Sequence, residues 1–138
     1  MTDADAEEIY LVDCHGLREI AKSKSNSLKS MLSNGTIVVP SCVWQEFSEL
    51  FEEEAAVLAP LVHNKLTMKR AYHIGAASIA ERSNPGFSSS PYDSNSDLYC
   101  AAICAAEGYT LLTTVSRFSK YKKMRCCEVM DVAALGLI

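Results

Sequence analysis

Three short runs of apolar and β-branched residues constrain the fold of this chain more than any other feature. The first covers residues 9–12, the second is TIVVP at 36–40, and the third is YTLLTT at 109–114. They lack the strict alternation of a half-exposed strand, which is typical of strands buried on both faces of a parallel sheet. Pro40 cannot donate a hydrogen bond to a neighbouring strand, so it marks the end of the second run.

The segments between these runs have helical patterns. Residues 16–33 fit one interrupted helix or two short ones, Asn34-Gly35 supplies a turn, and the helix beginning near Val43 is expected to break or shift at Glu54. Beyond it we expect a helix over 65–82 with room for a short strand before it, a loop over 83–96, a helix over 97–107, a basic helical turn around Phe118, a strand over 126–130 and a short helix or tail over 131–138. Strands separated by helices predict an α/β fold, a three-layer α/β/α sandwich with a central parallel sheet.

Composition bounds the remaining possibilities. A chain of 138 residues with 49% hydrophobic residues is expected to form a single domain over residues 1–138. No apolar run approaches the roughly 20 residues that span a bilayer, and the acidic start MTDADAEE is unlike a secretory signal. The six cysteines contain no CxxC pair, so we expect them to be reduced and mostly buried. These features predict a cytoplasmic protein without a membrane segment.

Three acidic residues occupy positions that parallel sheets use for ligands. Asp13 directly follows the first strand, Glu46 lies one turn into the helix after the second, and Asp97 begins the helix that precedes the third. Carboxylates converging beyond the carboxyl ends of strands suit Mg²⁺ or Mn²⁺. Each residue also has a simpler explanation, because carboxylates stabilise the first turn of a helix and Glu46 borders an apolar stripe. Asp13 is the hardest to explain without a site, since a carboxylate after a buried strand needs solvent, hydrogen bonds or a metal.

The segments IYLVDCHGL, IVVPSCVWQEF and SDLYCAAICAAEGYTLLTTVSRF together resemble the PIN domain family, in this order and over nearly the whole chain. That family includes the toxin ribonucleases of bacterial toxin–antitoxin pairs. The resemblance implies a Mg²⁺- or Mn²⁺-dependent endoribonuclease, with Asp13, Glu46 and Asp97 as its metal-binding and catalytic acids. It further implies RNA as the substrate, a cognate antitoxin protein as a partner, and formation of a homodimer.

The chain departs from the family pattern at the fourth acidic position, which Val115 occupies. Valine cannot bind a metal, so Ser116 is the nearest polar substitute. Thr113 matches the strand threonine of the family and is expected to hold a site water or a carboxylate, and Asp93 is a further carboxylate from the loop. The departure leaves a second reading open, in which the chain is a catalytically weak or inactive PIN-like module that binds RNA or a protein partner.

A basic segment follows the third strand, with five cations in nine residues: Arg117, Lys120, Lys122, Lys123 and Arg125. Basic residues attract the RNA backbone, and aromatic residues such as Phe118 and Tyr121 can stack on unpaired bases. We therefore expect Arg117, Lys120, Lys122 and Lys123 to bind RNA, with a solvated helix face as the alternative. A phosphatase-like domain with Asp13 as its nucleophile is disfavoured. Such a domain would need a second acid two residues later, and this chain has His15 there.

Overall fold

The structure of the protein is a computed structural model that describes residues 8–63, 65–83, 95–124 and 127–136. Within these ranges the strands are β1 (Tyr10–Val12), β2 (Ile37–Pro40), β3 (Lys65–Leu66), β4 (Thr110–Thr113) and β5 (Val129–Asp131). They form one parallel sheet in the order β3-β2-β1-β4-β5. The first, second and third apolar runs of the sequence form β1, β2 and β4, which are the three central strands.

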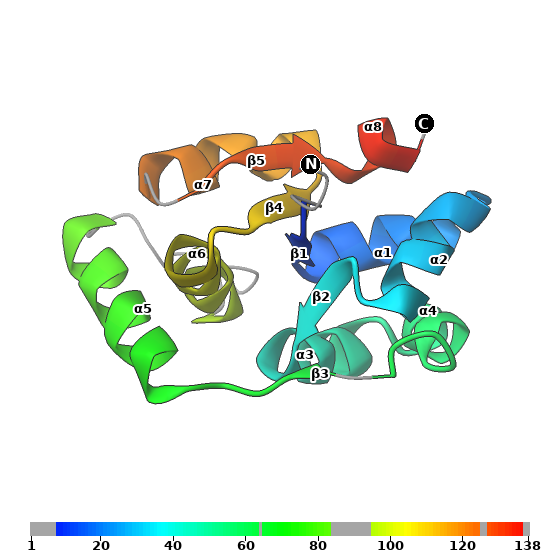
Figure 1. Ribbon diagram of the computed structural model, residues 1–138, viewed down its shortest axis with the longest axis horizontal. Helices are drawn as coiled ribbons and strands as arrows, with labels where there is room; N and C mark the ends of the chain where they lie inside the picture. Colours follow the sequence, from blue (N-terminus) through cyan, green and yellow to red (C-terminus); the bar gives the residue numbers. More distant parts are fainter. Residues whose placement is uncertain (1–7, 64, 84–94, 125–126, 137–138) are drawn as a thin grey trace, which may run out of the picture.

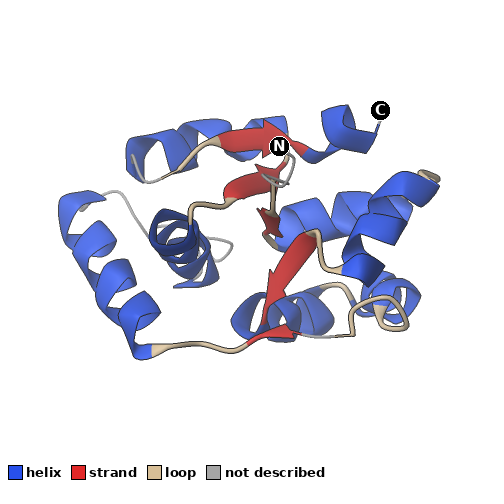
Figure 2. Ribbon diagram, in the orientation of Figure 1, coloured by secondary structure: helices blue, strands red, loops and turns tan. Residues whose placement is uncertain are grey.

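Helices cover both faces of this sheet. They are α1 (Cys14–Lys22), α2 (Asn26–Asn34), α3 (Ser41–Leu50), α4 (Glu52–Leu58), α5 (Arg70–Ser83), α6 (Asn95–Glu107), α7 (Phe118–Met124) and α8 (Val132–Gly136), with a 3₁₀ turn η1 (Val115–Arg117) before α7. Figure 1 shows α1 and α2 on one side of the central strands and α5 and α6 on the other. Figure 2 shows the strands as a middle layer between helices. The predicted three-layer α/β/α sandwich is confirmed.

Several element boundaries differ from the expectations. Of the two alternatives for residues 16–33, the structure has the two short helices, α1 and α2, and Gly35 with φ 89° is the C-cap of α2. The break in the next helix falls at Phe51 (φ −132°, ψ 69°) and not at Glu54, which lies inside α4. Helix α6 already begins at Asn95, and the short strand before α5 is present as β3. Most of the predicted loop, residues 84–94, lies outside the described residues.

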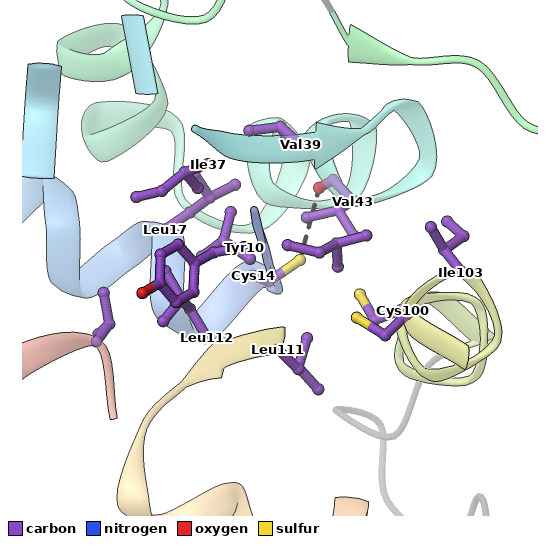
Figure 3. Packing of buried hydrophobic residues seen from close by; sticks show 14 of the residues in the cluster. Tyr10, Cys14, Leu17, Ile37, Val39, Val43, Cys100, Ile103, Leu111 and Leu112 are labelled. Atoms are coloured by element: carbon purple, nitrogen blue, oxygen red, sulfur yellow. Dashed lines mark hydrogen bonds between the residues drawn. The ribbon is translucent and has the colours of Figure 1, made fainter. Parts of the chain in front are cut away.

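The core lies on both sides of β1 and β4. Leu11, Leu111 and Leu112 have no exposed surface, as expected of strands that are covered on both faces. Figure 3 shows Cys14 and Cys100 within this core, where the thiol of Cys14 donates to the carbonyl of Val43 at 3.6 Å. Every described cysteine is a free thiol, and Cys14, Cys100 and Cys104 are buried, as predicted for those residues.

Strand β1 lies between β2 and β4, and its register aligns Val12 with Leu112. From β1 the sheet extends through β2 to β3 on one side and through β4 to β5 on the other. The topological switch point therefore falls between β1 and β4, at whose carboxyl ends ligands bind in parallel sheets. Asp13 follows β1 at this point. No helix of the described ranges has the length and apolar character needed to cross a membrane.

Candidate functional site

Asp13 is the N-cap of α1 and has no exposed surface. Its Oδ1 accepts from the backbone N–H of Gly16 at 2.8 Å. Its Oδ2 accepts from the hydroxyls of Thr113 and Tyr121, each at 2.7 Å. Burial raises the pKa of Asp13, and these three hydrogen bonds oppose that rise. Hydrogen bonds from the protein thus compensate the burial cost that the sequence identified for Asp13.

Asp97 lies in the first turn of α6, on the other side of the same phenol. Its Oδ1 accepts from the hydroxyl of Tyr121 at 2.9 Å, and the residue is 3% exposed. Tyr121 therefore lies between the two carboxylates, and a phenol has only one proton to donate to them. Burial, followed by the charge of Asp13, raises the pKa of Tyr121 well above its usual value, which keeps the phenol protonated at neutral pH.

Two cations bind the other oxygen of Asp97. The guanidinium of Arg117 and the ammonium of Lys120 both contact Oδ2, the latter at 2.9 Å. The two cationic side chains are only 14% and 19% exposed. The sequence predicted that Arg117 and Lys120 bind RNA, and in this structure both contact Asp97.

Glu46 is the third acid of the site and lies on α3. It is half-buried, whereas Glu49 one turn later is exposed. Its Oε1 accepts from the hydroxyl of Ser96 at 2.5 Å and from the thiol of Cys14 at 3.3 Å. These two donors are the sequence neighbours of Asp97 and Asp13. The three acids singled out in the sequence therefore come from separate elements and gather beside β1 and β4. We call Asp13, Glu46 and Asp97 the acid cluster.

The remaining predicted site residues are distributed around the acid cluster. Thr113 is buried and holds Asp13, as described above, whereas Ser116 is exposed and contacts Thr114 at 3.1 Å. Val115, at the fourth acidic position, is 60% exposed. Lys122 is exposed, with its ammonium 5.9 Å from the ring centroid of Phe118. Asp93 and the side chain of Lys123 lie outside the described residues.

Tyr121 is a site residue that the sequence analysis did not identify. Base stacking was a possible role for it, but its side chain is 1% exposed and its hydroxyl contacts two acids. The helical spacing i, i+3 and i+4 places residues 117, 120 and 121 on one face, but it does not indicate that this face is buried. Once an aromatic residue of this segment is placed inward, Arg117 and Lys120 lie on the same side.

The chemistry of the acid cluster suits a hard divalent cation, because its ligand atoms would be carboxylate oxygens. In the described ranges, however, no three His, Cys, Asp or Glu side chains lie close enough together to hold a metal ion as they stand. Asp97 is instead neutralised by Arg117 and Lys120. The carboxylates are the kind of ligand that a divalent metal requires. Asp97, however, must separate from Arg117 and Lys120 before it can bind a metal ion.

Replacing Tyr121 with phenylalanine tests the bridge between the two acids. Tyr121→Phe is expected to lower the free energy of unfolding by about 2 kcal/mol, because it removes the one hydroxyl proton that lies between two buried carboxylates. Tyr72→Phe is the matched control, since that ring is also 1% exposed but its hydroxyl serves one carboxylate, Glu107. Urea denaturation of both variants measures the difference. Equal losses of unfolding free energy in the two variants would show that the bridge between the two acids stabilises the protein no more than an ordinary buried tyrosine hydroxyl does.

Comparisons with known proteins give a fold and no family. No protein-family model matches this chain, and no curated protein matches it. The chain is similar to the crystal structure of PAE2754 from Pyrobaculum aerophilum, with a TM-score of 0.64 and 14% sequence identity. The match covers 96% of this chain and 95% of that one. At this identity the likeness shows a shared α/β fold over nearly the whole chain.

Proposed function

We propose that this protein is a PIN-like, divalent-metal-dependent endoribonuclease. The observation that carries the proposal is the gathering of Asp13, Glu46 and Asp97 at the switch point of a parallel sheet. The three residues are far apart in the sequence and belong to different elements, and carboxylates that meet at this edge suit a metal-dependent hydrolase. The choice of RNA over DNA rests on the resemblance to the PIN family.

In this proposal the acid cluster would hold Mg²⁺ or Mn²⁺. When bound, the metal supplies charge neutralisation at the scissile phosphate and a water of lowered pKa. The protein contributes a fixed orientation of the ligands: Gly16 and Thr113 hold both oxygens of Asp13, and Ser96 holds Glu46. Such supporting hydrogen bonds orient metal-binding carboxylates in other proteins. Exposed cations such as Lys122 are available to contact the RNA backbone.

A second candidate is a catalytically weak or inactive PIN-like module that binds RNA or a protein partner. Two observations favour it: Val115 stands at the fourth acidic position, and Asp97 is neutralised by cations of the protein itself. An antitoxin partner and a homodimer are proposed only from the likeness to toxin members of the PIN family. A cytoplasmic location also belongs to the proposal, supported by the free thiols of the described cysteines.

The function is tested by cleavage of an end-labelled single-stranded RNA with Mn²⁺, with Mg²⁺ and with excess chelator. Glu46→Gln is expected to lower the cleavage rate about 100-fold, because loss of one ligand charge costs about 3 kcal/mol of transition-state stabilisation. Glu49→Gln is the matched control, since it removes the same charge from the exposed face of α3. Calorimetry with Mn²⁺ accompanies both variants. The enzyme proposal fails if wild type neither binds Mn²⁺ nor cleaves, or if Glu46→Gln cleaves as fast as wild type.

A further inference from the structure

The acid cluster carries its own counter-cations. Arg117 and Lys120 belong to η1 and α7, the segment that follows β4, and both reach Oδ2 of Asp97. Their side chains are 14% and 19% exposed, and that of Asp97 is 4% exposed. Ion pairs on a protein surface contribute little to stability, whereas removing one partner of a buried pair is costly because the other charge stays out of water. The contacts of Arg117 and Lys120 with Asp97 are therefore part of the folded structure of the site.

Both oxygens of Asp97 are occupied in this arrangement. Arg117 and Lys120 contact Oδ2, and the hydroxyl of Tyr121 contacts Oδ1. A Mg²⁺ or Mn²⁺ ion binds a carboxylate oxygen at about 2.1 Å, which would bring it within a few ångströms of both cationic groups. Repulsion between cations at such distances is strong in a poorly hydrated site. A metal and the two side chains therefore compete for Asp97.

We propose that Arg117 and Lys120 form a gate on the metal site: they bind Asp97 in the metal-free protein and leave it when a divalent cation binds. This inference rests on the proposed function and adds a regulatory step to it. The two released cations would then lie beside the acid cluster with their charge available to an RNA phosphate. Metal and RNA would consequently strengthen each other's binding, since coupling between two ligands is reciprocal.

Chemical labelling of lysines tests the gate in the wild-type protein, without any substitution. Lys120 is ion-paired and mostly buried, whereas Lys122 on the same helix is exposed. An amine-specific ester followed by mass spectrometry reports how accessible each ammonium is. With Mn²⁺ at a concentration that calorimetry shows to be saturating, modification of Lys120 is expected to rise several-fold and that of Lys122 to stay unchanged. No rise at Lys120, or an equal rise at both lysines, overturns the gate.

Substitution gives an independent readout of the same competition. Arg117→Gln and Lys120→Gln each remove one competing charge, so each is expected to lower the Kd for Mn²⁺ about tenfold in calorimetry. Lys122→Gln removes the same charge from the exposed side of α7 and is expected to bind Mn²⁺ as wild type does. Circular dichroism establishes that each variant is folded, and the labelling experiment decides the question where one is not.

The outcomes separate the gate from the proposed function. If wild type binds Mn²⁺ and cleaves RNA, but neither glutamine variant binds the metal more tightly, the gate is refuted and the nuclease stands. If neither wild type nor the glutamine variants bind Mn²⁺, both proposals fall together. Tighter binding in both variants with release of Lys120 in the wild type supports the gate.

Discussion

Asp97→Asn is expected to lower the free energy of unfolding by about 3 kcal/mol. The substitution preserves the shape of the side chain and leaves Arg117 and Lys120 facing a neutral amide. Breaking one side of a buried ion pair costs about 3–5 kcal/mol, because the remaining charge stays out of water. The lower end of that range applies here, since both cationic side chains retain some contact with solvent.

Urea denaturation of Asp97→Asn, Lys120→Met and the double variant measures this effect as a double-mutant cycle. A coupling energy of about 1 kcal/mol or more is expected, since the two side chains are in direct contact at 2.9 Å. Asp97→Asn with wild-type stability and no coupling would mean that the contacts with Arg117 and Lys120 contribute nothing to folding. In that case the acid cluster would have to be held by other interactions.

The sequence predicted the sheet and the places of the acids well, because both depend on local patterns. The uninterrupted apolar runs of β1, β2 and β4 can be satisfied only in a sheet covered on both faces. In such a sheet Asp13 must emerge at the carboxyl edge, and Glu46 must lie near the border of an apolar helical stripe. The structure places them so, with Asp13 buried and Glu46 half-buried.

The inward turn of the basic segment could not be predicted in the same way. Five cations in nine residues leave Phe118, Tyr121 and Met124 to indicate which face is buried, and the two aromatic residues looked equally suited to base stacking. The choice depends on Asp97, a buried acid 20 to 24 residues earlier in the chain. Such long-range pairing has no signature in a local pattern. The predicted break at Glu54 was also misplaced. The break falls at Phe51, between α3 and α4, and both of these helices contact α1.

The fold also explains why Asp13 alone does not establish a metal site. Its three donors, Gly16, Thr113 and Tyr121, already provide the hydrogen bonds that a buried carboxylate requires. A structural role is therefore sufficient for Asp13. A metal site would require Glu46 and Asp97 as well, so Glu46→Gln separates metal binding from the structural role of Asp13.

Gly16→Ala is expected to lower the free energy of unfolding by about 2 kcal/mol, although alanine is the better helix former. The new Cβ would lie 2.5 Å from Cγ2 of Val12 and 2.8 Å from the carbonyl oxygen of Leu112. Val12 is a stiff β-branched side chain with no exposed surface, and the carbonyl belongs to β4. The overpacking cost, about 3 kcal/mol here, exceeds the gain of up to about 1 kcal/mol in helix propensity.

The same substitution disturbs the acid cluster, because the backbone N–H of Gly16 holds Oδ1 of Asp13. Gly75→Ala in α5 is the matched control, since its Cβ would meet Ala102 Cβ at a milder 3.2 Å. Thermal and urea denaturation are expected to show a clear loss for Gly16→Ala and a change near zero for Gly75→Ala. Mn²⁺ affinity is expected to fall only in the first variant. Equal stability of the two variants would mean that α1 moves off the sheet at little cost, and the position of Asp13 would then be set by Thr113 and Tyr121 alone.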